Sequence, residues 1–172
     1  MKKRSNYSVD IDPARVEEIK QDRLRFTKNK LSSSMALLAI AFNALYFISL
    51  YSSDVGKYFY TYIIGASVVY NLLFMLCTFL SSEGVKSYKL SYAVLLLAVG
   101  AMQVVRIFYI PMKAHATEVL VGTENVLAMG DGQFVRVIAY LSLSALACFA
   151  GGVIGILKTR TLERYKKKIN AI

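Results

Sequence analysis

The apolar residues of this chain fall into four long blocks with almost no charge. Three blocks are free of charged residues, and the remaining one, the third along the chain, contains Arg106. A helix rises about 1.5 Å per residue and a bilayer core is about 30 Å thick, so each block is long enough to cross a membrane. Backbone groups in lipid must be hydrogen-bonded within their own segment, which predicts a helix for each block. The four predicted spans cover about 31–53, 58–82, 90–112 and 137–157.

The segments outside the blocks are short and polar. Residues 1–30 form a leader in which Asp12 and Pro13 have the sequence of a helix start. The residues that follow place a narrow, weakly apolar stripe on one helix face, and the stripe consists of Val16, Ile19, Arg23 and Phe26. Two interpretations stay open: a helix lying on the bilayer surface, or a docking helix for a cytoplasmic partner. Residues 158–172 form a basic tail that we expect to continue the fourth helix.

These patterns predict an all-α fold. The chain should be an integral membrane four-helix bundle, residues 31–157, preceded by an N-terminal cytoplasmic amphipathic helix. The composition agrees, because 56% of the 172 residues are hydrophobic and 19% are charged. This composition excludes an intrinsically disordered chain. The polar segments are too short for a separate catalytic domain with its own core.

The distribution of Lys and Arg predicts the orientation. The leader holds nine of these residues, the loop 81–89 holds two, and the tail holds six. The positive-inside rule then places both termini in the cytoplasm, and we expect the cytoplasmic (inner) membrane of a prokaryote. The net charge of +10 therefore lies mostly beside the membrane, where it attracts anionic lipid headgroups. Nucleic-acid binding is not expected, since it would need a basic folded face with interleaved aromatic residues, and the sequence indicates none.

Three amide side chains lie at similar depth inside the predicted spans. They are Asn43, Asn71 and Gln103, and each sits on a helix face of small or polar residues. We expect these faces to point inward and the amides to meet near the middle of the membrane. One interpretation is structural, because hydrogen bonds between spans hold helices together. The other is functional, with the amides lining a polar cavity or path.

Arg106 is the charged residue inside a span. Placing an arginine at the centre of a span costs about 2.5–3.5 kcal/mol on insertion scales, so its position needs an explanation. It would either extend outward to the membrane surface or pair with Glu118, Glu124 or Asp131. The alternative is a site for an anion or a lipid phosphate. Gln103 and Tyr109 lie one turn to either side of Arg106 and would complete that site.

Two further patterns bear on packing. The fourth span carries Ala147, Gly151 and Gly155, a spacing that lets another helix approach closely, from the same chain or from a second subunit. In the loop before it, two apolar runs, 119–121 and 126–129, flank the turn residues 122–125. This loop would lie on the membrane surface, pack over the mouth of the bundle, or form a short hairpin.

The sequence contains no recognisable catalytic, metal-binding or cofactor-binding motif. All 11 acidic residues lie outside the spans, which disfavours a proton- or sodium-coupled transporter. The leading hypothesis is a non-enzymatic subunit or scaffold of a membrane complex for transport or envelope functions, or a homo-oligomer. The second hypothesis is a channel or facilitator lined by Asn43, Asn71, Gln103 and Arg106. The third is a lipid-handling enzyme that uses Arg106 on a phosphate.

Overall fold

A computed structural model describes residues 13–51, 61–121, 124–127 and 129–170 of the chain. The predicted helix start at Asp12 lies outside these residues. The described elements, in chain order, are α1 (Pro13–Phe26), α2 (Lys30–Tyr51), α4 (Thr61–Lys86), α5 (Leu90–Tyr109), α6 (Pro111–His115), β1 (Glu118–Val121), β2 (Glu124–Leu127) and α7 (Asp131–Asn170).

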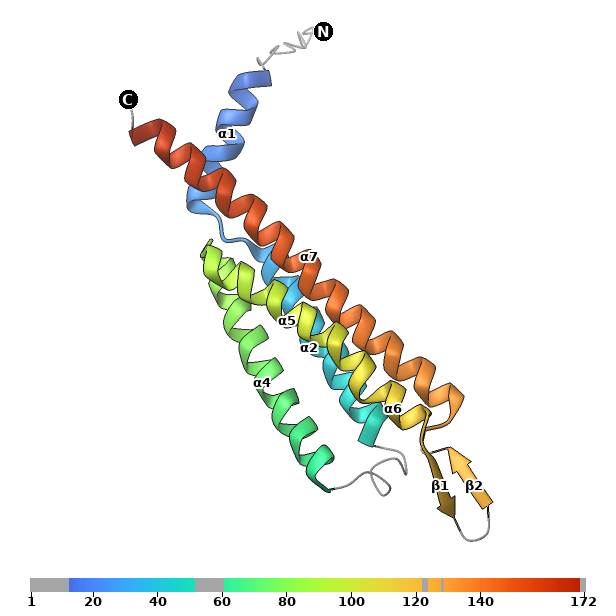
Figure 1. Ribbon diagram of the computed structural model, residues 1–172. Coiled ribbons are helices and arrows are strands. Elements are labelled where there is room, and N and C mark those ends of the chain that lie inside the picture. Colours follow the sequence, from blue (N-terminus) through green and yellow to red (C-terminus); the bar gives the residue numbers. More distant parts are fainter. Residues whose placement is uncertain (1–12, 52–60, 122–123, 128, 171–172) are drawn as a thin grey trace, which may run out of the picture.

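Four of these helices are long and apolar enough to cross a membrane: α2, α4, α5 and α7. They form an up-and-down bundle in which α4 and α7 each pack against both α2 and α5 (Figure 1). The predicted all-α four-helix bundle is therefore confirmed. Within the described residues, the departure from it is the antiparallel pair β1–β2, in which Glu118 faces Leu127.

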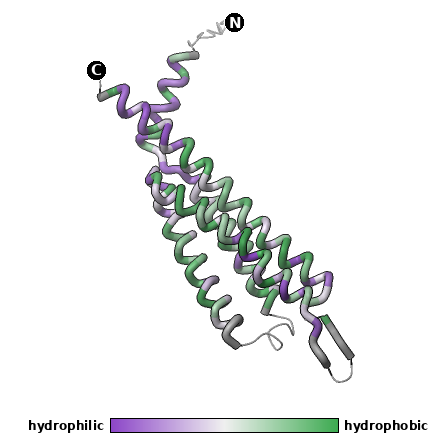
Figure 2. The backbone as a smooth tube through the Cα atoms, in the orientation of Figure 1, coloured by the Kyte–Doolittle hydropathy of each residue, from purple (hydrophilic) through white to green (hydrophobic). Residues whose placement is uncertain are grey.

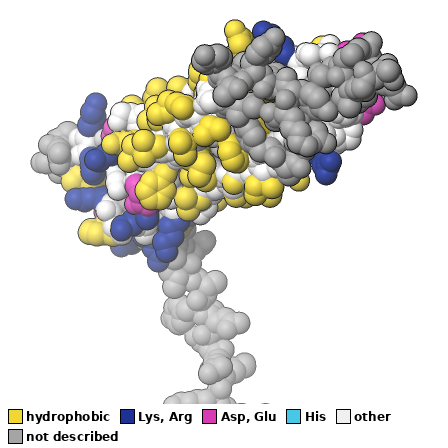
Figure 3. All heavy atoms as spheres, turned by 90° about the horizontal axis from the view of Figure 1, so that it is seen from below, with side chains coloured by type: hydrophobic (Ala, Val, Ile, Leu, Met, Phe, Trp, Pro, Cys, Tyr) yellow, Lys and Arg dark blue, Asp and Glu magenta, His cyan; other side chains and the backbone are white. Residues whose placement is uncertain are grey.

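The outside of the bundle is apolar along the spans and basic at one end. Large side chains such as Leu72, Leu146 and Leu157 are each 62% exposed. Contiguous apolar surface of this kind is expected where helices face lipid. Figure 2 shows the hydrophilic residues gathered where α1 and the end of α7 leave the bundle. Figure 3 shows a broad hydrophobic band, with most of the visible Lys and Arg side chains at one side of it.

The interior consists of two apolar clusters with a polar layer between them. One cluster lies near β1 and β2 and consists of Tyr46, Leu50, Ala114, Met129, Val137 and Leu141. The other lies nearer the termini and consists of Ala36, Ala39, Phe74, Leu96, Ala147 and Cys148. Asn43 and Ser144 fall between the two clusters on α2 and α7 and are fully buried. The polar layer therefore lies inside the membrane-spanning part of the bundle.

Asn29 joins three spans at the end of the bundle from which α1 and the last turns of α7 emerge. This end is called the basic end below. The Asn29 side-chain oxygen caps α2 by accepting a hydrogen bond from the Ser32 backbone N–H at 3.4 Å. The same oxygen accepts a bond from Lys158 Nζ on α7 at 3.3 Å. The Asn29 backbone N–H donates to the Lys86 carbonyl at the end of α4, at 3.1 Å. One buried amide thus fixes the start of α2 against α4 and α7.

At the opposite end, a proline sets the path of the chain. Pro111 has no backbone N–H to donate, so α5 ends at Tyr109 and the short helix α6 begins with this proline. His115, the last residue of α6, stacks on Phe134 of α7 with ring centroids 4.2 Å apart. Met129, which follows β2, is fully buried in the nearby apolar cluster. The connection between α5 and α7 thus forms a hairpin and also packs over the end of the bundle.

Candidate functional site

Arg106 is buried in the bundle, with 4% of its surface exposed. Its Nη1 donates to Asn71 Oδ1 at 2.7 Å and to Asn43 Oδ1 at 3.4 Å. Its Nη2 donates to Ser67 Oγ at 3.1 Å. The guanidinium on α5 thus reaches side chains of α2 and α4. It is directed into the bundle and does not extend to the membrane surface along its own helix.

The guanidinium of Arg106 packs against the ring faces of two tyrosines. Its central carbon lies 4.3 Å from the ring centroid of Tyr46 and 4.6 Å from that of Tyr70. Both distances are within the range of about 6 Å at which the electron-rich face of a ring attracts a cation. The rings and the neutral oxygens together replace the water that a guanidinium would otherwise bind.

Gln103 extends the hydrogen bonds to the fourth span. Its Nε2 donates to Asn43 Oδ1 at 2.9 Å and to Ser144 Oγ at 3.3 Å. Ser144 donates in turn to the backbone carbonyl of Ala39 at 2.9 Å. Asn43 Nδ2 donates to Asn71 Oδ1 at 3.2 Å, which closes the set. We call these six side chains the Arg106 network: Asn43, Ser67, Asn71, Gln103, Arg106 and Ser144.

The Arg106 network contains at least one side chain from each of the four spans. It therefore acts as a cross-link between α2, α4, α5 and α7 in a region where the hydrophobic effect does not hold helices together. Its amide and guanidinium groups bind and orient other groups. They do not act as nucleophiles or bases at neutral pH. The chemistry of the site is thus that of holding helices or a ligand.

Two buried amide atoms of the network have no hydrogen-bond partner among the described residues. They are Asn71 Nδ2 and Gln103 Oε1. One is a donor and the other an acceptor. A buried polar group without a partner costs about 1–3 kcal/mol, so such atoms are uncommon in a purely structural core.

The structure does not place Tyr109 with Arg106 and Gln103. Tyr109 is 68% exposed, and Lys113 Nζ lies 4.6 Å from the centroid of its ring. The structure therefore does not bring Tyr109 together with the other two residues of the predicted site. Successive three-residue steps rotate backwards around a helix by about 60° each, because a helix has 3.6 residues per turn. By Tyr109 the position has left the inward face, and Ile110 packs inward there.

Sequence reasoning missed two of the residues around Arg106. Tyr70 gave no signal, because an aromatic residue next to Asn71 in an apolar span is also typical of a lipid-facing position. Ser144 did carry a signal. It precedes Cys148, Gly151 and Gly155 at steps of four, three and four residues, which places it on the small-residue face of the fourth span.

The small-residue face of α7 contacts other helices of the same chain. A Cβ added to Gly151 would lie 3.0 Å from a side-chain carbon of Leu96 on α5 and 3.1 Å from the Ser32 carbonyl on α2. A Cβ added to Gly155 would lie 3.0 Å from Ala93 Cβ. The Ser32 hydroxyl also donates a hydrogen bond to the Gly151 carbonyl. Ala147, on the same face, is buried in the apolar cluster nearer the termini.

Comparisons of this chain with protein-family models, with curated proteins and with solved structures find no match.

Proposed function

We propose that this protein is a non-enzymatic subunit or scaffold of a membrane complex, with both termini in the cytoplasm. The observation that carries the proposal is the Arg106 network. Asn43, Gln103 and Arg106 direct their side chains at one another and at neighbouring spans. The glycine face of α7 is likewise occupied by α2 and α5. The interior of the bundle thus holds the spans together, and a partner would bind elsewhere.

One surface open to a partner lies at the basic end. Helix α1 lies outside the bundle, beside the last turns of α7 (Figure 1), and its residue Phe26 is 82% exposed. Ile19, on the same stripe, is 50% exposed. Single exposed apolar residues are ordinary, but two on one face of a helix outside the bundle make an anchoring surface. This surface favours contact with a second membrane subunit or with another copy of the chain.

The proposal predicts a stoichiometric protein partner. Protein extracted from its own membranes in a mild detergent should give, by native mass spectrometry, a complex with a second polypeptide or a defined homo-oligomer. Phe26→Glu should reduce the yield of this complex about tenfold or more, because it places a charge on the anchoring surface. Leu127→Glu on β2 is the matched control and should leave the yield unchanged. A monomer, or a complex that both variants preserve equally, would contradict the proposal.

A second candidate is a facilitator for a small anion, favoured by the unpartnered Asn71 Nδ2 beside Arg106. Under this reading, liposomes containing the purified protein should show chloride flux above that of empty liposomes. Asn71→Leu should reduce the flux at least tenfold, because the substitution removes the buried donor beside Arg106. Val69→Leu, on the exposed face of the same helix, should have no effect. Absence of flux in the unmodified protein would remove this candidate.

A further inference from the structure

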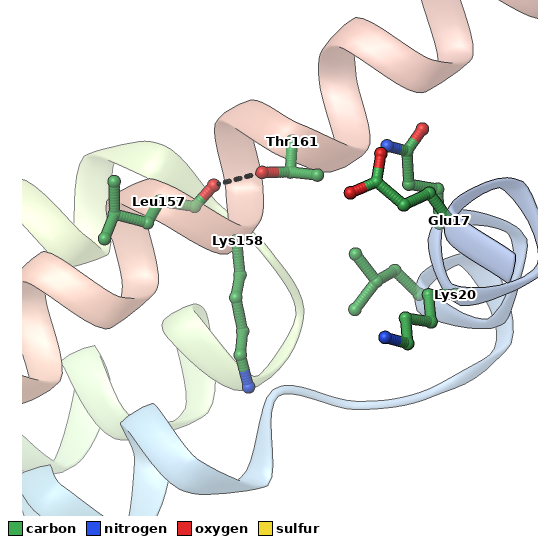
Figure 4. A pocket seen from close by; sticks show the side chains of 7 residues that line it. Glu17, Lys20, Leu157, Lys158 and Thr161 are labelled. Carbon is green, nitrogen blue, oxygen red and sulfur yellow. Dashed lines mark hydrogen bonds between the residues drawn. The ribbon is translucent and has the colours of Figure 1, made fainter. Parts of the chain in front are cut away.

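A cleft lies between α1 and α7 at the basic end of the bundle. Its volume is about 330 Å³, which is at the lower end of the range for small-molecule sites (Figure 4). We call it the α1–α7 cleft. It is lined by Glu17, Lys20, Gln21, Leu24, Leu157, Lys158 and Thr161. An ion pair between Glu18 and Lys168, 3.8 Å apart, also connects the two helices beyond the cleft.

The α1–α7 cleft lies where the apolar surface of the bundle ends. Leu157 is the last residue of the charge-free block 137–157, and Lys158 is the first charged residue after it. Leu157 is 62% exposed on the outside of the bundle. In a bilayer, the level at which an apolar helix surface gives way to lysine is the level of the lipid headgroups. The cleft is thus open to headgroups, and an apolar flank adjoins it.

The positive and negative side chains of the cleft lie on opposite sides of it. Lys20 on α1 and Lys158 on α7 end on the same side of the cleft, and Glu17 lies on the side of Thr161 (Figure 4). Lys158 Nζ already donates one hydrogen bond to Asn29 Oδ1, and its other two N–H groups remain. Together with the ammonium group of Lys20 they form a place for a phosphate, since each ammonium donates charge-assisted hydrogen bonds. The carboxylate on the other side is an acceptor for hydroxyl groups. Further Lys and Arg residues of the leader and the tail add to the positive field at this end.

We propose that the α1–α7 cleft binds the headgroup of an anionic phospholipid. The phosphate lies between Lys20 and Lys158, headgroup hydroxyls donate to Glu17, and the acyl chains follow the exposed side of Leu157. Charge complementarity selects an anionic lipid, because two cations and one anion line the site. This lipid fixes α1 against α7 at the membrane surface. The proposal does not depend on the subunit role proposed above.

The test is lipid binding to the purified, delipidated protein. Dioleoylphosphatidylglycerol and dioleoylphosphatidylcholine are titrated separately in detergent, and bound lipid is counted by native mass spectrometry. The glycerol lipid should be retained in one copy and more tightly than the choline lipid. Lys20→Gln should weaken its binding about fivefold, the effect expected of one lysine at a membrane surface. Glu17→Gln should strengthen binding of the anionic lipid, because it removes the negative charge from the cleft.

Matched controls separate the cleft from the general positive charge of this end. Lys167→Gln and Glu163→Gln make the same charge changes on α7 outside the cleft. Both should leave binding within about twofold, since neither side chain lines the cleft and salt screens a charge that does not contact the headgroup. The proposal is overturned if each control changes binding as much as its counterpart in the cleft. It is also overturned if the choline lipid binds equally well, or if millimolar inorganic phosphate displaces the lipid completely, which would indicate a site for a soluble anion.

Discussion

Arg106→Ala is expected to lower the free energy of unfolding of the bundle by about 3 kcal/mol. The substitution removes three side-chain hydrogen bonds, each worth about 0.6 kcal/mol between spans. It also removes contacts with the rings of Tyr46 and Tyr70, which are worth about 0.5–1 kcal/mol each even at exposed sites. Placing an arginine in the bilayer has a cost, but the inserted, unfolded chain has the same cost. This cost therefore does not make Arg106→Ala stabilising. Unfolding by SDS in bicelles measures the change.

Two other substitutions show whether this effect belongs to the site. Arg136→Ala makes the same chemical change at an exposed position on α7 and should stay within about 0.5 kcal/mol of the unmodified protein. Arg106→Lys should recover less than half of the stability that Arg106→Ala loses. A point charge cannot bind two acceptors and also lie between two rings, as a planar guanidinium does. Equal stability of the Arg106→Ala and Arg136→Ala proteins would show that Arg106 extends to the membrane surface.

Gly151→Leu is expected to destabilise the bundle by about 3 kcal/mol or more. An added Cβ alone would lie 3.1 Å from the Ser32 carbonyl oxygen, and backbone cannot move aside as a side chain can. Inserting carbons into a packed core costs about 1–3 kcal/mol, and a leucine adds four. The helices α2 and α7 must therefore separate, which also breaks the hydrogen bond from Ser32 to the Gly151 carbonyl.

Gly65→Leu is the matched control for this prediction. Gly65 is a glycine of α4 with no atom within 4 Å of an added Cβ. Its replacement should be neutral or slightly stabilising, because leucine has a higher helix propensity than glycine. The unfolding experiment in bicelles applies to both proteins. If Gly151→Leu were as stable as Gly65→Leu, the close contact of α7 with α2 would be contradicted.

The spans and their inward faces could be predicted because each depends on one segment alone. Charge-free blocks indicate helices, and small or polar residues at helical spacing indicate the packed face. Asn43, Asn71, Gln103 and Arg106 all lie on such faces, and the structure brings them together. The orientation of the bundle relative to the cytoplasm stays a prediction.

The remainder of the site depends on how the helices are rotated and shifted along their axes relative to each other. A single sequence does not contain this information. Tyr109 is one turn from Arg106 in sequence, yet Tyr70 of another helix provides the ring at 4.6 Å. The hairpin also could not be chosen among the three arrangements predicted for its loop. Strands of four residues, such as β1 and β2, are too short for a reliable alternating pattern.

The central claim is that Arg106 donates a hydrogen bond to Asn71 inside the bundle. A double-mutant cycle between these two residues tests this claim most directly. The free energy of unfolding is measured for the unmodified protein, for Asn71→Ala, for Arg106→Ala and for the double variant. Because Arg106 Nη1 and Asn71 Oδ1 are 2.7 Å apart, we predict a coupling energy of about 0.6–1.7 kcal/mol. Additive effects, with a coupling energy below about 0.3 kcal/mol, would contradict the account.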